Sequence, residues 1–419
     1  MRVHRLSEWS IAGIAAFCIG WWWPDLLAFS RIEMGRWVAI SCLAGLLMAW
    51  RIYSKDRWLG LTLAGLSIST AFNMLTNRTA LVHGTPQGPT VTFTTSPLLA
   101  LLTVLALGMV FLIASEIKPS ISKRIAKAFV MVGVFSGALS VWQWFGGRWP
   151  GIYPGDPMDL GAAPGLFGNP GLQGGILAVL MPLSLAFMPI LFPVLLAGLL
   201  LSKSSIGVLA ATVAIPYMLG SWKFLLTLGL VGLVAFVFLV DRPKGAELER
   251  LKVWKATFWL WPRYPKGRLL GDQRLPFSWE SATFGWGLSM FSKRFPLWDY
   301  RLFRIGLIRE EEPETLAGGA HDRTKTGEGV TARGSSWIRT HNEYLQLLFE
   351  GGLVSFLPFL AFLAFLGLRL EKAARETRVW AASLLAGLVF ALWHFPFQTA
   401  ASALVLSFAT GRLYAKEAT

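Results

Sequence analysis

Residues 174–201 read GGILAVLMPLSLAFMPILFPVLLAGLLL, without a single charged side chain. A helix needs about 20 apolar residues to cross the hydrocarbon core of a bilayer. The apolar segment that contains this stretch, residues 171–201, forms either one bent span, with Pro182 inside it, or two shorter spans. The choice between one span and two decides the topology, because an odd number of spans would put the termini on opposite sides of the membrane.

The composition of the whole chain also favours a membrane protein. Of its 419 residues, 54% are hydrophobic and only 15% are charged, whereas a soluble domain carries about 25% charged residues. Too few polar groups remain to cover a water-exposed surface, so lipid must solvate much of the chain. The 20 tryptophans suit the headgroup layer, where an indole finds both apolar and polar partners.

Apolar runs recur along the chain and predict an all-α membrane protein of about 12 transmembrane helices. The expected helices are 9–29, 37–50, 58–75, 97–115, 128–146, 171–188, 189–201, 205–220, 223–240, 351–369, 379–394 and 398–413. The first run has no small-residue cleavage site after it and is interpreted as a retained helix. One charged insert interrupts the pattern, so we divide the chain into residues 1–240, 241–340 and 341–419.

The distribution of lysine and arginine predicts the orientation. The net charge is +15, and nothing resembles a nucleic-acid-binding module, so the basic residues are assigned to cytoplasmic loops and anionic lipid. With the N-terminus inside, the cytoplasmic segments hold 16 lysines and arginines and the short outer loops hold five. This asymmetry favours twelve spans, two cytoplasmic termini and an insert on the outer side.

The insert begins with an amphipathic segment, residues 247–261 (ELERLKVWKATFWLW). Its apolar residues at helical spacing are Leu248, Leu251, Trp254, Phe258 and Trp261, and the opposite side holds Glu249, Lys252 and Lys255. A helix with tryptophan on one face and basic residues on the other lies in the plane of the membrane interface. We therefore expect an interfacial helix within the large outer loop.

Several basic residues gather near the predicted outer surface. Lys203 lies in a Ser-Lys-Ser-Ser turn between two apolar spans, and Arg250 lies on the amphipathic segment. A cation at the interface is costly unless it meets an anion, and no acidic residue flanks Lys203, so an external anion is its natural partner. Arg339 and Arg148 are further candidates. The alternatives are that Lys203 snorkels and that the arginines contact lipid phosphate or water.

His341 is the candidate for proton transfer, because an imidazole exchanges a proton near neutral pH. It stands where the polar insert meets an apolar helix, and Asn342, Glu343 and Tyr344 follow it with hydrogen-bonding side chains. His394 ends another predicted helix and is assigned a packing role.

Metal and nucleotide sites are not indicated. Cys18 and Cys42 lie inside apolar runs, which argues against a disulfide framework or a cysteine metal site. No His, Glu or Cys spacing is typical of zinc, and no Gly-rich loop follows a strand. We expect neither a metal nor a cofactor.

Five short motifs follow one another along the chain. They are GLFGNP at residues 165–170, SK at 202–203, RLKVWKA at 250–256, GWGLSMF at 285–291 and HNEYL at 341–345, with EGG at 350–352 soon after. Over roughly residues 160–370 their order resembles the O-antigen ligase and O-antigen polymerase family of bacterial envelope enzymes. Two positions differ, because the family often has arginine at Lys203 and asparagine at Gly171. Lysine keeps the charge but loses the bidentate fork that fits phosphate.

The resemblance implies a metal-independent glycosyltransferase of the bacterial inner membrane. Its members transfer an oligo- or polysaccharide from a polyprenyl (undecaprenyl) diphosphate carrier to an acceptor hydroxyl at the periplasmic face. The expected site comprises His341 as the catalytic residue, Lys203, Arg250, Arg339 and Arg148 as diphosphate ligands, and Asn169, Asn342, Glu343 and Tyr344 as supporting residues.

The most specific expectation is an O-antigen ligase-like enzyme of lipopolysaccharide biosynthesis, which joins the glycan to lipid A–core. Alternatives within the family are an O-antigen or exopolysaccharide polymerase and a protein O-oligosaccharyltransferase. A secondary transporter or lipid flippase is the alternative from another class, although the predicted spans carry few of the mid-membrane ionisable residues that transporters use. The expected partners are the lipid-linked donor, a glycan, lipid A–core or protein acceptor, and membrane lipids, but no nucleic acid.

Overall fold

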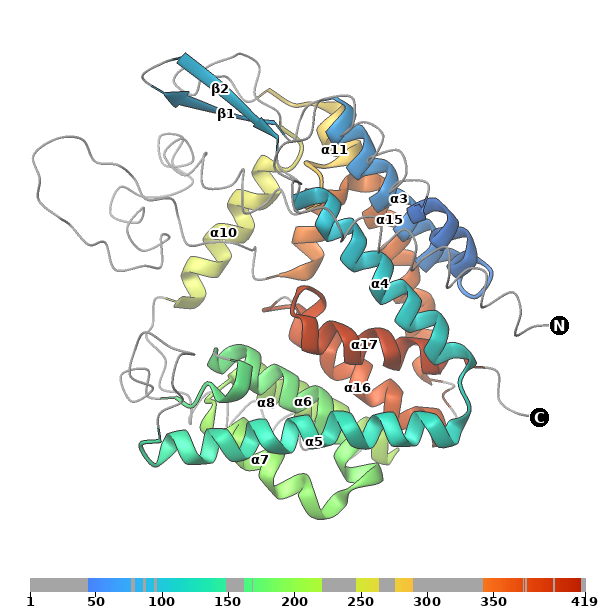
Figure 1. Cartoon of the computed structure of the whole chain (residues 1–419), viewed down its shortest axis with the longest axis vertical. Helices are drawn as coiled ribbons and strands as arrows, with labels where there is room; N and C mark the ends of the chain where they lie inside the picture. Colours follow the sequence, from blue (N-terminus) through green and yellow to red (C-terminus); the bar gives the residue numbers. More distant parts are fainter. Residues whose placement is uncertain are drawn as a thin grey trace, which may run out of the picture. The chain divides into compact units, whose positions relative to one another are not determined.

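A computed structural model shows a mainly helical chain (Figure 1). It describes residues 44–76, 80–85, 88–93, 96–147, 162–167, 169–220, 246–263, 276–288, 342–371, 373, 375–394 and 396–415. The described residues divide between two compact units. Unit 1 lies within Met1–Gly108, Glu247–Thr340 and Leu345–Leu363, and unit 2 lies within Met109–Ala246, His341–Tyr344 and Ala364–Thr419.

Helices occur at every predicted span that the described ranges include. They are α3 (Arg57–Leu75), α4 (Ser96–Glu116), α5 (Pro119–Trp144), α6 (Pro170–Phe187), α7 (Phe192–Leu201), α8 (Ser205–Leu219), α15 (Glu343–Glu371), α16 (Arg375–Ala391) and α17 (Ala400–Leu413), with a further helix over 44–53. The amphipathic segment forms α10 (Ala246–Leu260), and α11 (Trp279–Phe284) follows it. The predicted spans 9–29 and 223–240 lie outside the described residues.

The apolar segment 171–201 consists of two helices, α6 and α7, rather than one bent helix. Pro182 is tolerated inside α6, and the chain turns at Met188 and the 3₁₀ turn Pro189–Leu191 before α7 begins. A proline lacks the backbone N–H that would continue a helix, which explains the break. With 10 residues, α7 is only about 15 Å long, half of a typical hydrocarbon core.

Three of the described helices are long and apolar enough to cross a membrane, judged by length and composition. They are Pro119–Trp144, Pro170–Phe187 and Glu343–Glu371. Shorter apolar helices accompany them, among them Ser205–Leu219 and Ala400–Leu413. The helices therefore suit a membrane protein.

A β-hairpin that the sequence did not predict lies between α3 and α4. Its strands, β1 (Ala80–Thr85) and β2 (Gly88–Phe93), pair antiparallel, with Ala80 opposite Phe93 and Thr85 opposite Gly88. The segment is rich in valine and threonine, whose branched side chains favour extended backbone. The predictions from sequence rest on long apolar runs, and these strands are too short and too polar to form one.

In unit 1, α11 and the residues after it pack against α15 where its backbone bends at Gly352. We call this contact the glycine clasp. The amide of Trp286 donates to the Phe349 carbonyl, and that of Gly287 donates to the Glu350 carbonyl, each at 2.9 Å. The Trp286 ring stacks on Phe349 with centroids 5.5 Å apart. Thus the GWG and EGG motifs, far apart in sequence, form one structural contact.

Glycine is required at two points of this clasp. Gly285 and Gly352 have φ of +65° and +62°, a region that side chains rarely occupy. A Cβ at Gly285 would lie 2.6 Å from the Glu350 carbonyl oxygen, so the backbones approach too closely for any larger residue. These glycines of the motifs therefore have a packing role.

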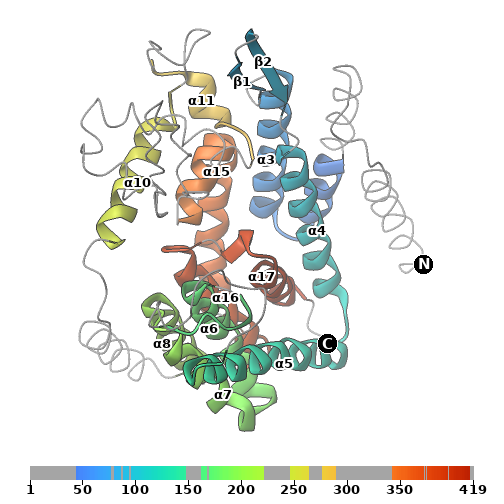
Figure 2. The same ribbon diagram turned by 60° about the vertical axis from the view of Figure 1, so that its left-hand side comes forward.

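Unit 2 is a bundle of α5, α6, α7, α8, α16 and α17, which lie side by side in both Figure 1 and Figure 2. Small residues bring its helices into close contact. A Cβ at Gly207 would lie 2.6 Å from the Gly174 carbonyl carbon, and a Cβ at Gly198 would lie 2.6 Å from the Gly137 Cα. Small residues at crossings are typical of helices that pack within membranes.

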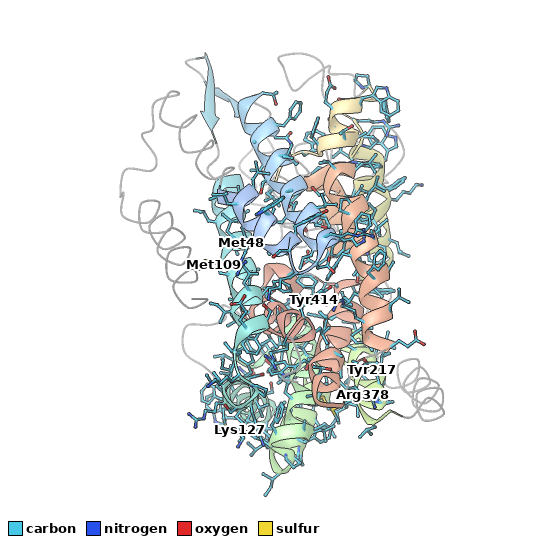
Figure 3. The ribbon with its side chains drawn as sticks, turned by 90° about the vertical axis from the view of Figure 1, so that its right-hand side faces the viewer. Met48, Met109, Lys127, Tyr217, Arg378 and Tyr414 are labelled. Atoms are coloured by element: carbon cyan, nitrogen blue, oxygen red, sulfur yellow. The ribbon has the colours of Figure 1, made fainter. Side chains whose placement is uncertain are left out.

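One end of this bundle is basic. Arg412 donates to main-chain carbonyls at the end of α4, at 2.9 Å to that of Ile117. Nη1 of Arg378 lies 2.8 Å from where a Cβ of Gly220 would stand, at the end of α8, and Figure 3 shows Arg378 beside Tyr217. Arginines at helix carboxyl ends meet unpaired carbonyls and the negative end of the helix dipole.

Candidate functional site

The opposite end of the unit 2 bundle gathers three of the motif segments. Here α5 ends, α6 begins, α7 turns into α8, and α15 begins beside the end of α16. The contacts that join these segments are all within unit 2. This end is therefore the candidate active site.

Asn169 begins α6 as its N-cap. Its Oδ1 accepts hydrogen bonds from the amides of Gly171 (2.8 Å) and Leu172 (3.2 Å), and Pro170 occupies the first turn, where its missing N–H is harmless. Asn169 and Pro170 of the motif are thus explained by the way in which α6 begins. The role of Asn169, a predicted supporting residue, is to start the helix that faces the site.

A buried polar network fixes the GLF segment against α5. Gln173 is fully buried; its Oε1 accepts from Ser136 (2.7 Å) and its Nε2 donates to Ser140 (2.9 Å). The Gly165 amide donates to Oε1 of Gln143 at 2.8 Å. Buried polar groups that are mutually satisfied hold a unique geometry. Sequence reasoning missed this network, although its α5 members recur three and four residues apart, the spacing of one helix face.

Lys203 projects from a rigid turn. Ser202 and Ser204 on either side of it are 1% and 3% exposed, whereas Lys203 is exposed. The Ser202 hydroxyl donates to the Leu199 carbonyl at 2.6 Å. Lys203 itself has φ +49°, unusual for a residue with a side chain and often found where function demands it.

The Lys203 turn is attached to the first turn of α6. The Ser204 hydroxyl donates to the Gly171 carbonyl at 3.3 Å and accepts from the Gly207 amide at 3.2 Å, which caps α8. On the other side, Nζ of Lys203 lies 5.5 Å from the ring centroid of Trp144, the last residue of α5. The bonds to α6 and α8 thus hold the turn from which the Lys203 side chain projects toward the end of α5.

Asn342, Glu343 and Tyr344 anchor the start of α15. The Asn342 amide and the Tyr344 hydroxyl donate to main-chain carbonyls at the end of α16, at 3.1 and 3.0 Å. Oε1 of Glu343 accepts from the amide of Phe397 at 2.9 Å. These three predicted supporting residues therefore position the segment that begins immediately after His341.

His394 is a second histidine at this end. It is buried, its ring lies 4.9 Å from that of Phe390, and a Cβ at Gly171 would lie 2.7 Å from its Nε2. The imidazole therefore occupies the room that a larger residue at position 171 would need. This contact gives a physical reason for glycine where the resembling family often has asparagine. From its position at the end of a predicted helix, His394 was expected to pack structurally. Nothing in the sequence indicated that it lies against the start of α6.

A continuous path of contacts connects the site. It runs from the Lys203 turn through Gly171 to His394, and from the end of α16 to Asn342. Asn169 and Lys203 are thereby brought to the same end of the bundle as Asn342, Glu343 and Tyr344. His341, Arg148 and Arg339 lie outside the described residues.

Arg250 belongs to α10 in unit 1, and only its backbone is described. In the described part of α10, Val253 and Leu260 are fully buried, whereas Leu251 and Phe258 are 53% and 58% exposed. The helix therefore has a second apolar stripe that points outward, on the face that the sequence assigned to the membrane interface.

Arg263, just beyond α10, was not singled out by the sequence. Its guanidinium carbon lies 4.1 Å above the Trp259 ring, and Nη1 donates to the Trp259 carbonyl. Burial lowers the pKa of Arg263, but an arginine starts so high that it remains charged at neutral pH. The Arg263 guanidinium therefore interacts with the last turn of α10.

Among the described residues, no group of three or more His, Cys, Asp or Glu side chains could hold a metal ion. Comparison with protein-family models, curated proteins and solved structures finds no match to the chain. Function therefore has to be inferred from the chemistry of the site.

Proposed function

We propose that the protein transfers a glycan from a polyprenyl diphosphate carrier to an acceptor hydroxyl, as an O-antigen ligase-like enzyme. The observation that carries the proposal is the meeting of three motif segments at one end of unit 2. The starts of α6 and α15 and the Lys203 turn are distant in sequence, yet they are joined by hydrogen bonds and by the His394 contact. An exposed lysine on a rigid turn is a suitable ligand for a diphosphate.

The proposal includes a membrane topology. We place twelve spans in the bacterial inner membrane, with both termini in the cytoplasm and residues 241–340 on the periplasmic side. The charges of unit 2 support this orientation, since Lys203 stands at one end of the bundle and Arg378 and Arg412 at the other. The carrier chain would remain in lipid while its diphosphate reaches Lys203 at the surface.

In the proposed reaction, His341 and Lys203 have separate roles. His341 accepts the proton of the acceptor hydroxyl as that oxygen forms a bond to the anomeric carbon of the donor sugar. The bond between this carbon and the diphosphate oxygen breaks, and the polyprenyl diphosphate leaves with the electron pair. Lys203 offsets the charge that develops on the leaving group, and Arg250 stays a predicted diphosphate ligand. Atoms and charge balance without a nucleotide or an oxidant.

The first test measures transfer from a polyprenyl diphosphate-linked glycan by the purified full-length protein. His341→Ala should lower the rate by about 10²–10⁴-fold, the usual contribution of a general base. His83→Ala, a change in β1, is the control and should retain the wild-type rate. Full activity of the His341→Ala variant would exclude the proposed mechanism.

The acceptor is assigned to lipid A–core, and the envelope glycans of a deletion strain test it. Loss of all polymer from lipid A–core supports a ligase. Attachment of single repeat units would instead identify a polymerase, and loss of glycan from proteins alone would identify a protein O-oligosaccharyltransferase. Uptake driven by an ion gradient in proteoliposomes would favour a transporter.

A further inference from the structure

Trp144 stands beside Lys203 with its ring accessible. It is the last residue of α5, its side chain is 40% exposed, and its ring centroid lies 5.5 Å from Nζ of Lys203. The next residue, Phe145, is 82% exposed. An aromatic surface is thus adjacent to the cation that the proposed function assigns to the diphosphate.

The backbone segments that carry both side chains are held in place before any ligand binds. The end of α5 is fixed by the bond between Gln143 and Gly165, and the Lys203 turn is fixed by the bond from Ser204 to Gly171 of α6. Binding to segments that are already ordered loses less conformational entropy than binding that must order them. The two segments therefore form a preformed framework for a subsite.

The contact between the two is one that a ligand can replace. A separation of 5.5 Å is close to the outer limit of about 6 Å for a cation above a ring, where an exposed pair gains little. A charge-assisted hydrogen bond from the ammonium group to a phosphate oxygen is stronger. A bound diphosphate would draw the Lys203 side chain from the indole and uncover its face.

A glycosyl diphosphate has the two features that this pair matches. Its phosphate is anionic, and the pyranose bonded to that phosphate presents a face of C–H groups, which packs on aromatic rings. One phosphoester bond separates the two parts, so a ligand held by Lys203 places its first sugar next to the indole. An indole offers a broad apolar face for such a ring.

We propose that Trp144 is the stacking platform for the sugar bonded directly to the diphosphate of the donor. This assignment rests on the proposed function and adds a determinant of donor specificity to it. Lys203 binds the leaving group, and Trp144 orients the sugar whose anomeric carbon is attacked. The identity of this first sugar should therefore affect binding through Trp144.

Trp142 provides a matched comparison. It lies two residues earlier on the same helix, on a different face, and is 47% exposed. Its ring covers Gly147 and not Lys203. If exposed tryptophans at this end of α5 serve only as membrane-interface anchors, replacing either one should have the same effect.

The experiment compares Trp144→Ala, Trp144→Phe and Trp142→Ala in the full-length protein. Transfer is assayed with varied glycosyl donor, and binding of polyprenyl diphosphate without a sugar is measured separately. Trp144→Ala should raise the donor KM about tenfold, the loss of one stacking contact, without changing binding of the sugar-free carrier. Trp144→Phe should recover most of the loss, and Trp142→Ala should change neither quantity.

Three results would overturn the assignment. They are an unchanged donor KM in Trp144→Ala, an equal rise in Trp142→Ala, and a parallel loss of sugar-free carrier binding in Trp144→Ala, which would place the lipid or the diphosphate on the ring. Failure of the proposed function is distinct, because the wild-type protein would then show no transfer at all. Thermal unfolding of each variant in detergent identifies any that fails to fold.

Discussion

Lys203 has the backbone conformation that L-residues avoid, at a cost of about 1–2 kcal/mol. Its φ of +49° is maintained by buried serines on both sides and by their bonds to α6 and α7. A glycine at this position would avoid the cost, so the lysine fits the proposed role of its ammonium group as a diphosphate ligand. Strain of this kind is stored where the surrounding structure enforces it.

Two substitutions at this position separate strain from function. Lys203→Gly and Lys203→Ala both remove the charge, but only glycine relieves the positive φ. The glycine variant should therefore be more stable than the alanine variant by about 1 kcal/mol, measured as the shift in thermal unfolding in detergent. Both variants should lose at least about tenfold in transfer, because the diphosphate loses a charged ligand.

The stability measurement and the transfer measurement test separate claims. Equal stability of the glycine and alanine variants would contradict the positive φ of Lys203. Wild-type transfer by either variant would contradict the role of the ammonium group, whatever the stability.

At the scale of elements, the glycine clasp shows that a motif can be structural. Gly352 breaks the helical backbone of α15 with φ 62° and ψ −169°, and its neighbours accept the amides of the GWG segment. The GWG and EGG motifs belong to the same ordered series along the chain as the motifs at the candidate site. Their order therefore did not show which motifs serve packing and which could serve chemistry. Only the pairing of α11 with α15 made the distinction.

Gly352→Ala tests the clasp. A Cβ would lie 2.6 Å from the Thr283 carbonyl carbon, and the backbone conformation is essentially reserved for glycine, so the variant should lose about 3 kcal/mol or more of stability. Gly367→Ala in the same helix is the control. No atom lies within 4 Å of a Cβ there, so alanine should be neutral or stabilising by up to about 1 kcal/mol. Similar unfolding temperatures for both variants would contradict the clasp.

At the scale of the whole molecule, the proposed topology separates the two ends of unit 2 across the membrane. Three described helices are long and apolar enough to span it, while α7, with its 10 residues, packs against α5 and α6. Because α5 runs from exposed Lys123 to Trp144 beside Lys203, its two ends should face different compartments.

Cysteine labelling in cells tests this separation. In a chain carrying Cys18→Ser and Cys42→Ser, an added Lys203→Cys should react with a membrane-impermeant maleimide supplied from the periplasmic side. Lys123→Cys should react only after the inner membrane is permeabilised, because charged probes do not cross hydrocarbon. Equal labelling of both positions in intact membranes would contradict the proposed orientation.

The helical class and the approximate positions of the described helices follow from the amino-acid sequence, because the length of an apolar run is a local property that solvation by lipid requires. The sequence also predicted an anion-binding role for Lys203, a cation between apolar spans, and that role stays a prediction. It left open whether 171–201 forms one helix or two, and the structure resolved this as two. Only the tertiary structure placed His394 against Gly171, connected Gln173 to Ser136, and brought Trp144 to Lys203. These contacts join residues distant in the chain, so their existence depends on how helices pack and not on any local pattern.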